Sequence, residues 1–255
     1  MIFDTHAHYD DEAFDNDRDI LLNSMNKNGI KKIVNVGADI RSSKNSIELA
    51  GRYDYIYAAV GIHPSETEGI TEDDMEQIKI WTKEKKVVAI GEIGLDYHYQ
   101  EPDSEVQRKW FIRQLDIAKS CGLPIIIHSR DAAKETFDIL KSYEGKIIGG
   151  VIHCYSYSPE LAKEYVKMGY YIGVGGVVTF KNSKKLKETV EACPLNKIVL
   201  ETDCPYLAPV PDRGKRNSSL KLPYVVSEIA RLKGISDAEV IEMTYRNALD
   251  LYHIK

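Results

Sequence analysis

The sequence predicts a (β/α)₈ TIM barrel in the α/β class, with residues 1–255 forming a single domain. Eight short strand-like runs alternate with longer segments that repeat apolar residues at helical spacing, the order typical of a parallel sheet covered by helices. Several runs, such as Ile125-Ile126-Ile127, are wholly apolar, as strands buried on both faces are. An open doubly wound sheet is the alternative, but its usual Gly-rich turn after the first strand is absent.

The expected strands are short, and each pair is separated by enough chain for a helix and its loops. No internal repeat, low-complexity stretch or linker interrupts the series, which favours one domain. The strands are Ile2–Thr5, Lys32–Val36, Tyr55–Val60, Val87–Ile90, Pro124–Ile127, Ile147–Ile152, Tyr170–Val174 and Ile198–Leu200.

The expected helices carry start and stop signals. The first, Asp17–Asn28, ends at glycine, a common residue after a helix C-terminus. Thr71 is an N-cap residue followed by acidic residues that suit the helix dipole. Ser158-Pro159 opens a helix that runs to Met168, with proline at the first helical position. The other expected helices are Ser42–Gly51, Asp103–Ser120, Asp131–Lys141, Ser183–Ala192, Leu222–Leu232 and Ser236–Tyr252.

Composition and charge narrow the function classes. A hydrophobic content of 43% allows a sizeable core, and 29% charged residues favour solubility. The net charge of −5 argues against unspecific coating of nucleic acid or anionic membrane, yet a phosphate-bearing substrate remains possible where divalent cations supply positive charge. The four cysteines form no C-x-x-C pair, and no signal segment or apolar run of about 20 residues occurs. We therefore expect a soluble, cytoplasmic protein with free thiols.

Candidate metal ligands occupy one position in the predicted barrel, the carboxyl ends of the strands. His6 and His8 leave the first strand, and alternation along a strand puts both on one face, about 6.5 Å apart. Five of the seven histidines fall at such ends, where barrel active sites are built. The full set at these ends that would complete a metal site is His6, His8, Glu92, His128, His153 and Asp203.

The mixture of imidazoles and carboxylates predicts two divalent metal ions. His6, His8 and Asp203 offer ligands to one ion, and His128 and His153 to a second. Glu92 could bridge the two ions, at a separation of roughly 3.5–4 Å. A water molecule held there would become a nucleophile, with Asp203 as a candidate general base, so Glu92 and Asp203 are the expected catalytic residues. Zinc, manganese and magnesium all suit these ligands.

Other residues near the same strand ends are candidates for substrate binding. Arg213, Lys215 and Arg216 follow the eighth strand, where barrels often bind phosphate, and Arg130 could reach the same anion. His63 is either a substrate phosphate contact or a residue that stabilises its loop by a hydrogen bond. A solvated charged loop is the alternative for the three cations after the eighth strand.

Five other residues that could bind metal by residue type are not expected to do so. Asp4 is expected to brace the first strand's turn or a histidine, rather than to bind metal. Cys154 and Cys204 follow two expected ligands directly, and strand alternation would point them away from the metals. His98 and His253 are expected on the surface.

Six stretches spread over the chain carry a family resemblance. They are Phe3-Asp4-Thr5-His6-Ala7-His8, Val60-Gly61-Ile62-His63-Pro64, Ile90-Gly91-Glu92-Ile93-Gly94-Leu95-Asp96-Tyr97, Ile127-His128-Ser129-Arg130-Asp131-Ala132, Ile152-His153-Cys154-Tyr155-Ser156 and Leu200-Glu201-Thr202-Asp203-Cys204-Pro205-Tyr206-Leu207-Ala208-Pro209. In these stretches the chain resembles the TatD family of metal-dependent deoxyribonucleases, within the amidohydrolase-like barrels.

The resemblance implies a barrel, two divalent metals and hydrolysis of phosphodiester bonds in DNA. It carries ligand roles onto the six residues proposed above. Two departures from the family pattern occur: the chain continues Ser218-Ser219 after Asn217, where the family usually has an acidic residue and a proline, and Cys204 stands where a small residue is common.

Three functions are therefore open. The first is a deoxyribonuclease, an exonuclease acting on single strands or ends, with DNA as its partner and neither a membrane nor an obligate protein partner implied. The second is a hydrolase of another bond, an aminoacyl ester or a cyclic amide, although many such barrels use a modified lysine where Glu92 stands. The third is a binding protein with a structural metal, but structural zinc sites are normally closed by four protein ligands, largely cysteine and histidine.

Overall fold

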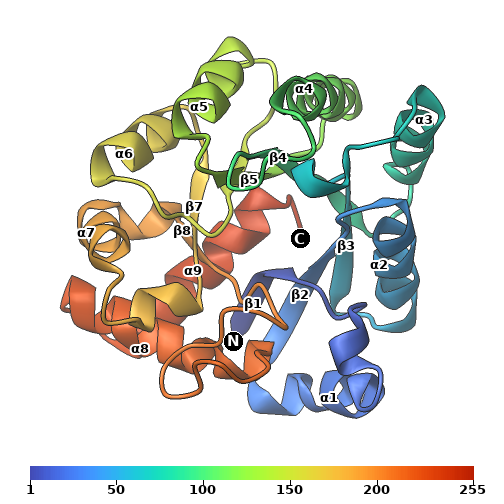
Figure 1. The fold of residues 1–255 in the computed structure, drawn as a ribbon. Coiled ribbons are helices and arrows are strands. Elements are labelled where there is room, and N and C mark those ends of the chain that lie inside the picture. The colour runs from blue at the N-terminus through green and yellow to red at the C-terminus, as the bar shows by residue number, and fades with distance from the viewer.

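The computed structural model describes residues 1–255 and contains eight parallel strands in the order of the sequence. Each strand pairs with the next, and a parallel bridge between Ala7 and Cys204 links the first strand to the segment after the last. The strands thus form a nearly closed barrel surrounded by helices (Figure 1). The strands are β1 (Ile2–Ala7), β2 (Ile30–Val36), β3 (Ile56–Val60), β4 (Val87–Asp96), β5 (Ile125–Arg130), β6 (Gly150–Ile152), β7 (Tyr171–Val174) and β8 (Ile198–Leu200).

The helices follow the strands in the expected alternation. Capping boxes begin three of them, with Asp39 capping α2, Thr71 capping α3 and Ser236 capping α9. The α-helices are α1 (Arg18–Ser24), α2 (Ile40–Arg52), α3 (Glu72–Trp81), α4 (Ser104–Cys121), α5 (Ala133–Ser142), α6 (Pro159–Lys167), α7 (Lys184–Ala192), α8 (Leu222–Lys233) and α9 (Asp237–Leu251). The predicted barrel is therefore confirmed, and none of these helices is long and apolar enough to cross a membrane.

Several element boundaries differ from the sequence prediction. β4 continues six residues past the apolar run, because it stays paired with β5 as far as Asp96. This pairing needs Gly94, where φ is 148° and an added Cβ would lie 1.9 Å from the carbonyl oxygen of His128. β6 covers only Gly150–Ile152 of the predicted run, and the first predicted helix ends as a separate 3₁₀ turn, Asn26–Asn28.

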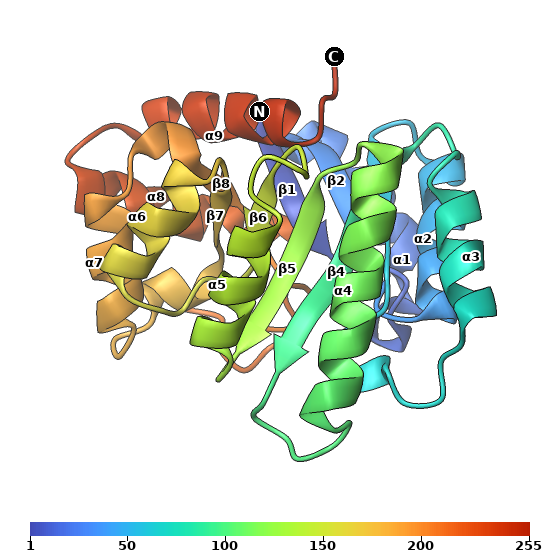
Figure 2. The same cartoon turned by 90° about the horizontal axis from the view of Figure 1, so that it is seen from above.

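α9 closes the end of the barrel opposite the strand arrowheads (Figure 2). Phe3 packs there against the rings of Tyr245 and Tyr252, with ring centroids about 6 Å apart. The hydroxyl of Tyr252 donates to the carbonyl oxygen of Thr5 at 2.8 Å, and the amide of Asn247 donates to that of Ile198 at 2.7 Å. Because this end is sealed, the carboxyl ends of the strands form the accessible mouth of the barrel.

Candidate metal centre

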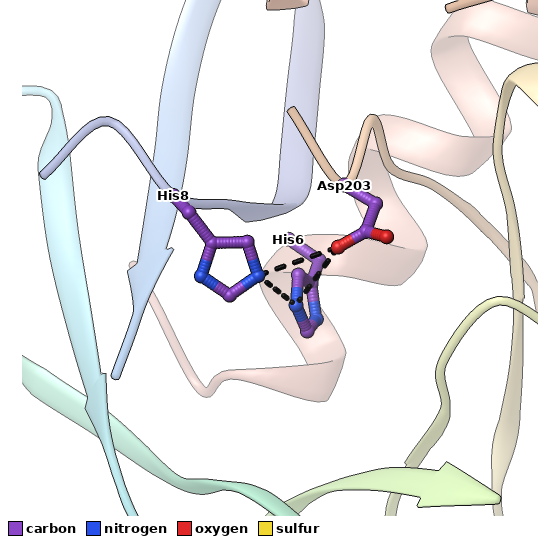
Figure 3. A group of neighbouring side chains, drawn as sticks. All are labelled: His6, His8 and Asp203. Atoms are coloured by element: carbon purple, nitrogen blue, oxygen red, sulfur yellow. Dashed lines mark hydrogen bonds and ion pairs between the residues drawn. The ribbon is translucent and has the colours of Figure 1, made fainter. Parts of the chain in front are cut away.

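The first group of candidate ligands lies where β1 meets the segment after β8. His6 is in β1 and His8 follows it, and their Nε2 atoms are 3.0 Å apart. Oδ1 of Asp203 is 3.3 Å from Nε2 of His8 and 3.7 Å from Nε2 of His6. Figure 3 shows the three side chains pointing toward one another across this seam. Alternation along the first strand therefore places the rings of His6 and His8 on the same face. Closure of the barrel between β1 and the segment after β8 brings the carboxylate of Asp203 beside them.

Glu92, within β4, lies between this group and a second one. Its Oε2 is 3.3 Å from Nε2 of His6. Its Oε1 is 2.9 Å from Nδ1 of His128 and 3.7 Å from Nε2 of His153. Two oxygens of one carboxylate thus face two sets of nitrogen donors, the geometry that a bridging ligand needs. The structure brings together all six residues that the sequence predicts as ligands.

Three of these histidines have their other ring nitrogen held by an acceptor. The pairs are Nδ1 of His8 with the carbonyl oxygen of Val36 at 2.9 Å, Nδ1 of His153 with Oε2 of Glu201 at 3.0 Å, and Nε2 of His128 with Oδ2 of Asp96 at 2.9 Å. Each held nitrogen donates a proton, so once the ring loses its second proton the lone pair of the other nitrogen faces the centre. Lone pairs that converge with carboxylate oxygens fit a divalent cation, so the residues present suit the metal that the sequence implies.

The charges of the centre favour bound cations. Burial alone would lower the pKa of His153, but the buried carboxylates around it raise that pKa to about 10. The same competition raises the pKa of His8 and of His128 to about 9. Burial would raise the pKa of Glu92, yet the imidazoles around it hold that pKa well below its usual range. Protons and metal ions therefore compete for one negatively charged site.

A cavity of about 1510 Å³ opens above the centre at the mouth of the barrel. Small-molecule sites typically occupy ~300–1,000 Å³, so this cavity has room for a larger, extended substrate. Five of the six candidate ligands line it, namely His8, Glu92, His128, His153 and Asp203. The arrangement can therefore hold cations next to a substrate and to water, as a hydrolytic centre must.

Comparison with known proteins agrees with this architecture. A family model described as "TatD related DNase" matches residues 3–253. The chain belongs to the TatD family of metal-dependent hydrolases. Its relatives include the metal-dependent hydrolase YabD of Bacillus subtilis, 42% identical over 100% of both chains, and YcfH of Escherichia coli, 33% identical over 100% of this chain and 96% of YcfH.

One solved structure supports the same family, and a second shares the fold alone. The crystal structure of YjjV, a TatD homologue from Escherichia coli, matches with a TM-score of 0.94 at 30% identity, covering 100% of this chain and 98% of that chain. An organophosphorus hydrolase from Deinococcus radiodurans matches with a TM-score of 0.62 at 14% identity, covering 98% and 92% of the two chains, and shares the fold alone.

Two buried carboxylates of this TatD-family site were not selected from the sequence. Asp96 and Glu201 contact His128 and His153, and they orient the rings that carry the candidate ligand nitrogens. Both had a sequence signal. Asp96 lies four residues after Glu92 on the same strand, and Glu201 lies two residues before Asp203.

Asp4 braces the seam, in agreement with the first of its expected roles. Its carboxylate accepts hydrogen bonds from the hydroxyls of Thr202 at 2.7 Å and Ser219 at 2.6 Å, and from the backbone N–H of His6 at 3.3 Å. It contacts no histidine ring. Because Ser219 belongs to the segment where the chain departs from the family pattern, that departure supplies one of the buried hydrogen bonds here.

The strand alternation on which the expectation for Cys154 rested is absent. Cys154 lies past the end of β6 with a φ of 44°, so strand alternation does not apply, and it lines the cavity beside His153. Its backbone N–H donates to Oε1 of Glu201 at 2.6 Å, which fixes this turn. Cys204 is buried outside the cavity lining, as expected.

His63 and Arg130, two of the predicted substrate contacts, line the cavity. Nδ1 of His63 accepts from the backbone N–H of Ser65 at 3.1 Å, which is the loop hydrogen bond of the sequence alternatives. Burial lowers the pKa of His63 to about 4, so the ring is neutral and carries its proton on Nε2, 4.0 Å from Oε1 of Glu92. His63 thus presents a donor to the cavity. The guanidinium of Arg130 lies over the exposed ring of Tyr99.

The structure does not bring the three cations after β8 into the cavity lining. Arg216 forms a two-pronged ion pair with Asp17, at 2.6 and 2.7 Å. Lys215 pairs with Asp212 at 2.7 Å, and the guanidinium of Arg213 lies 4.4 Å from the ring centre of Phe180. The contacts of Arg213 and Arg216 hold the loop against other segments of the barrel, whereas the ion pair of Lys215 lies within the loop.

Proposed function

We propose that this TatD-family hydrolase cleaves phosphodiester bonds of DNA at a centre of two divalent metal ions, as an exonuclease on single strands or ends. The observation that carries the proposal is the position of Glu92, whose two oxygens face the His6 side and the His128 side separately. The description of the matching family model, which names a DNase, supports DNA as the substrate. The free state of all four cysteines supports action in the cytoplasm.

The residues divide the work of the reaction. His6, His8 and Asp203 would hold one ion, His128 and His153 would hold the other, and Glu92 lies between the two groups. Bound divalent ions supply a lowered pKa for water and a positive charge opposite the phosphate oxygens. Asp203 accepts the proton of the attacking water as general base, and its side chain is 19% exposed toward the cavity. The Nε2–H of neutral His63 donates to a phosphate oxygen.

The test is nucleotide release from a short single-stranded DNA by metal-depleted protein titrated with magnesium, manganese or zinc. We expect metal-dependent release by the wild type and loss of at least ~10³-fold in Glu92→Gln, because the bridging charge is removed. Glu84→Gln, at an exposed residue before β4, is the matched control and should keep full activity. Metal content measured on all three proteins shows whether the substitution removes an ion.

Two outcomes would overturn the proposal. Wild-type protein shown to bind two ions that releases no nucleotide with any metal would exclude the DNA substrate and favour an ester or amide. A Glu92→Gln protein that keeps most of its activity would exclude the bridging role.

A further inference from the structure

The charges that line the cavity are divided between its two halves. The half built by segments after β1, β2 and β3 carries one cation, Arg41, and six carboxylates outside the metal centre, namely Asp10, Asp11, Glu12, Asp15, Asp39 and Glu66. The half built by segments after β5, β6, β7 and β8 carries three cations, Arg130, Lys184 and Lys185, and its only carboxylate is the candidate ligand Asp203. These halves face each other across the barrel, with α1 and α2 on one side and α5, α6 and α7 on the other (Figure 1).

The acidic half is held in place by its own hydrogen bonds. Asp39 caps α2, Asp11 accepts from the backbone N–H of Ala13 at 2.7 Å, and Asp15 pairs with Arg18. Asp10 accepts from the side-chain amide of Asn35 at 2.8 Å. These contacts fix the four carboxylates at the mouth. Only one of the four, Asp15, is paired with a cation, Arg18. The half therefore repels a polyanion.

The cationic half is open to an anion. Neither Arg130 nor Lys185 has a carboxylate within ion-pair distance, and both are exposed. The ammonium of Lys184 lies 3.7 Å from a carboxylate oxygen of Glu188 with 86% of its side chain exposed, so solvent screens that pair. This contrasts with Arg216, whose guanidinium forms a two-pronged ion pair with Asp17 outside the cavity.

We propose that Arg130, Lys184 and Lys185, here called the basic rim, bind the substrate phosphates that flank the scissile one. The inference rests on the proposed function and deepens it, because it assigns the strand to one half of the cavity. Two neighbouring lysines beyond β7 and the arginine that ends β5 line the cavity on the side of the centre where His128 and His153 lie. A phosphate backbone that leaves the centre in this direction meets cations, whereas the opposite direction meets six carboxylates.

The test is binding of a labelled phosphorothioate oligothymidylate, which keeps its charges but resists cleavage, to metal-loaded protein. Fluorescence anisotropy at increasing salt gives the dissociation constant and its salt slope. Each phosphate contact to a single strand contributes about 0.7 to the salt slope, so losing two contacts in Lys184→Glu/Lys185→Glu should make the slope smaller by about 1.4. The dissociation constant of this variant should be ~25-fold higher at about 0.1 M salt. Arg130→Ala should reduce the slope by about 0.7.

The matched control is Lys83→Glu/Lys85→Glu, which makes the same change in net charge. Lys83 and Lys85 are exposed and directly precede β4, at the end of the barrel opposite the cavity. This control should bind as the wild type does. An unchanged slope in the rim variant, or an equal loss in the control, would overturn the proposal. Because binding is measured without cleavage, rim-dependent binding by a protein that releases no nucleotide would refute the nuclease activity and leave the rim assignment standing.

Discussion

The carboxylate of Glu201 lies 3.0 Å from Nδ1 of His153, and both side chains are buried. Space for this contact exists because residue 173 is glycine, where an added Cβ would lie 2.3 Å from Oε2 of Glu201. Gly173, in β7, thus leaves the space in which the carboxylate of Glu201 contacts the ring of His153. The orientation of one candidate ligand depends on a position that carries no functional group.

Gly173→Ala should displace Glu201 and release the ring of His153. We expect metal affinity to fall by ~10–100-fold, the usual effect of losing a partner that orients a ligand, with a similar loss in Glu201→Ala. Competition with a chelating dye measures this affinity directly. Gly51→Ala, at a helical glycine with nothing within 4 Å of an added Cβ, is the control. Unchanged affinity in Gly173→Ala would show that His153 needs no such support.

Metal binding should release protons. The pKa values of about 9, 9 and 10 for His8, His128 and His153 mean that all three are protonated near pH 7 in the metal-free protein. Their ligand nitrogens must lose these protons to bind metal, so we expect about three protons per fully loaded chain and an affinity that rises with pH. Calorimetry in buffers of different ionisation enthalpy counts them. His253→Asn, at an exposed position, should not alter the count, and a count of zero would contradict the assigned charges.

The same groups set the pH dependence of stability in the metal-free protein. Their pKa values in the folded state exceed the unfolded value of about 6.5, so their contribution is fully present below about pH 6.5 and is lost as pH rises through 9 to 10. We expect the free energy of unfolding of metal-free protein to decrease over that range. Denaturant titrations at several pH values test this, and a stability that increases there would refute it.

The three cations after β8 should contribute little to DNA binding, in contrast to the sequence prediction. Arg213→Ala/Lys215→Ala/Arg216→Ala removes charges that are paired or stacked outside the cavity. We therefore expect its salt slope to stay within about 0.3 of the wild-type slope, well below the change of about 0.7 per lost phosphate contact. Anisotropy titration checks this. A salt slope smaller than the wild-type slope by about 2 would show that the three cations contact substrate phosphates.

The closure of the barrel by α9 can be weakened without touching the mouth. Tyr252→Phe removes the hydroxyl that donates to the buried carbonyl oxygen of Thr5, which should lower the free energy of unfolding by about 1–3 kcal/mol. Activity at a temperature where the protein stays folded should not change. Tyr224→Phe, at an exposed tyrosine, is the matched control for denaturant unfolding. Equal stabilities of the two variants would show that this hydrogen bond is dispensable.

The positions of the ligands could be predicted because strand alternation and the parallel order of a barrel are local and regular. His6 and His8 needed only the period of a strand, and Asp203 needed only its place after an apolar run. The pairing of Arg216 with Asp17 could not be found this way, because it joins residues 199 apart through loops with no periodicity. The extension of β4 was missed for a similar reason, since hydrogen bonds to β5, rather than an apolar pattern, continue it.

The seam between β1 and the segment after β8 has a consequence for synthesis of the protein on the ribosome. During synthesis the two histidines of the first group emerge almost at once, whereas Asp203 follows only after most of the chain. A ribosome-bound fragment that stops before β8 carries two of the three residues of the first group and lacks the strand that closes the barrel. A metal ion bound by all three residues of the first group would therefore require a chain synthesised past β8. Products that terminate before β8 would be inactive rather than partly active.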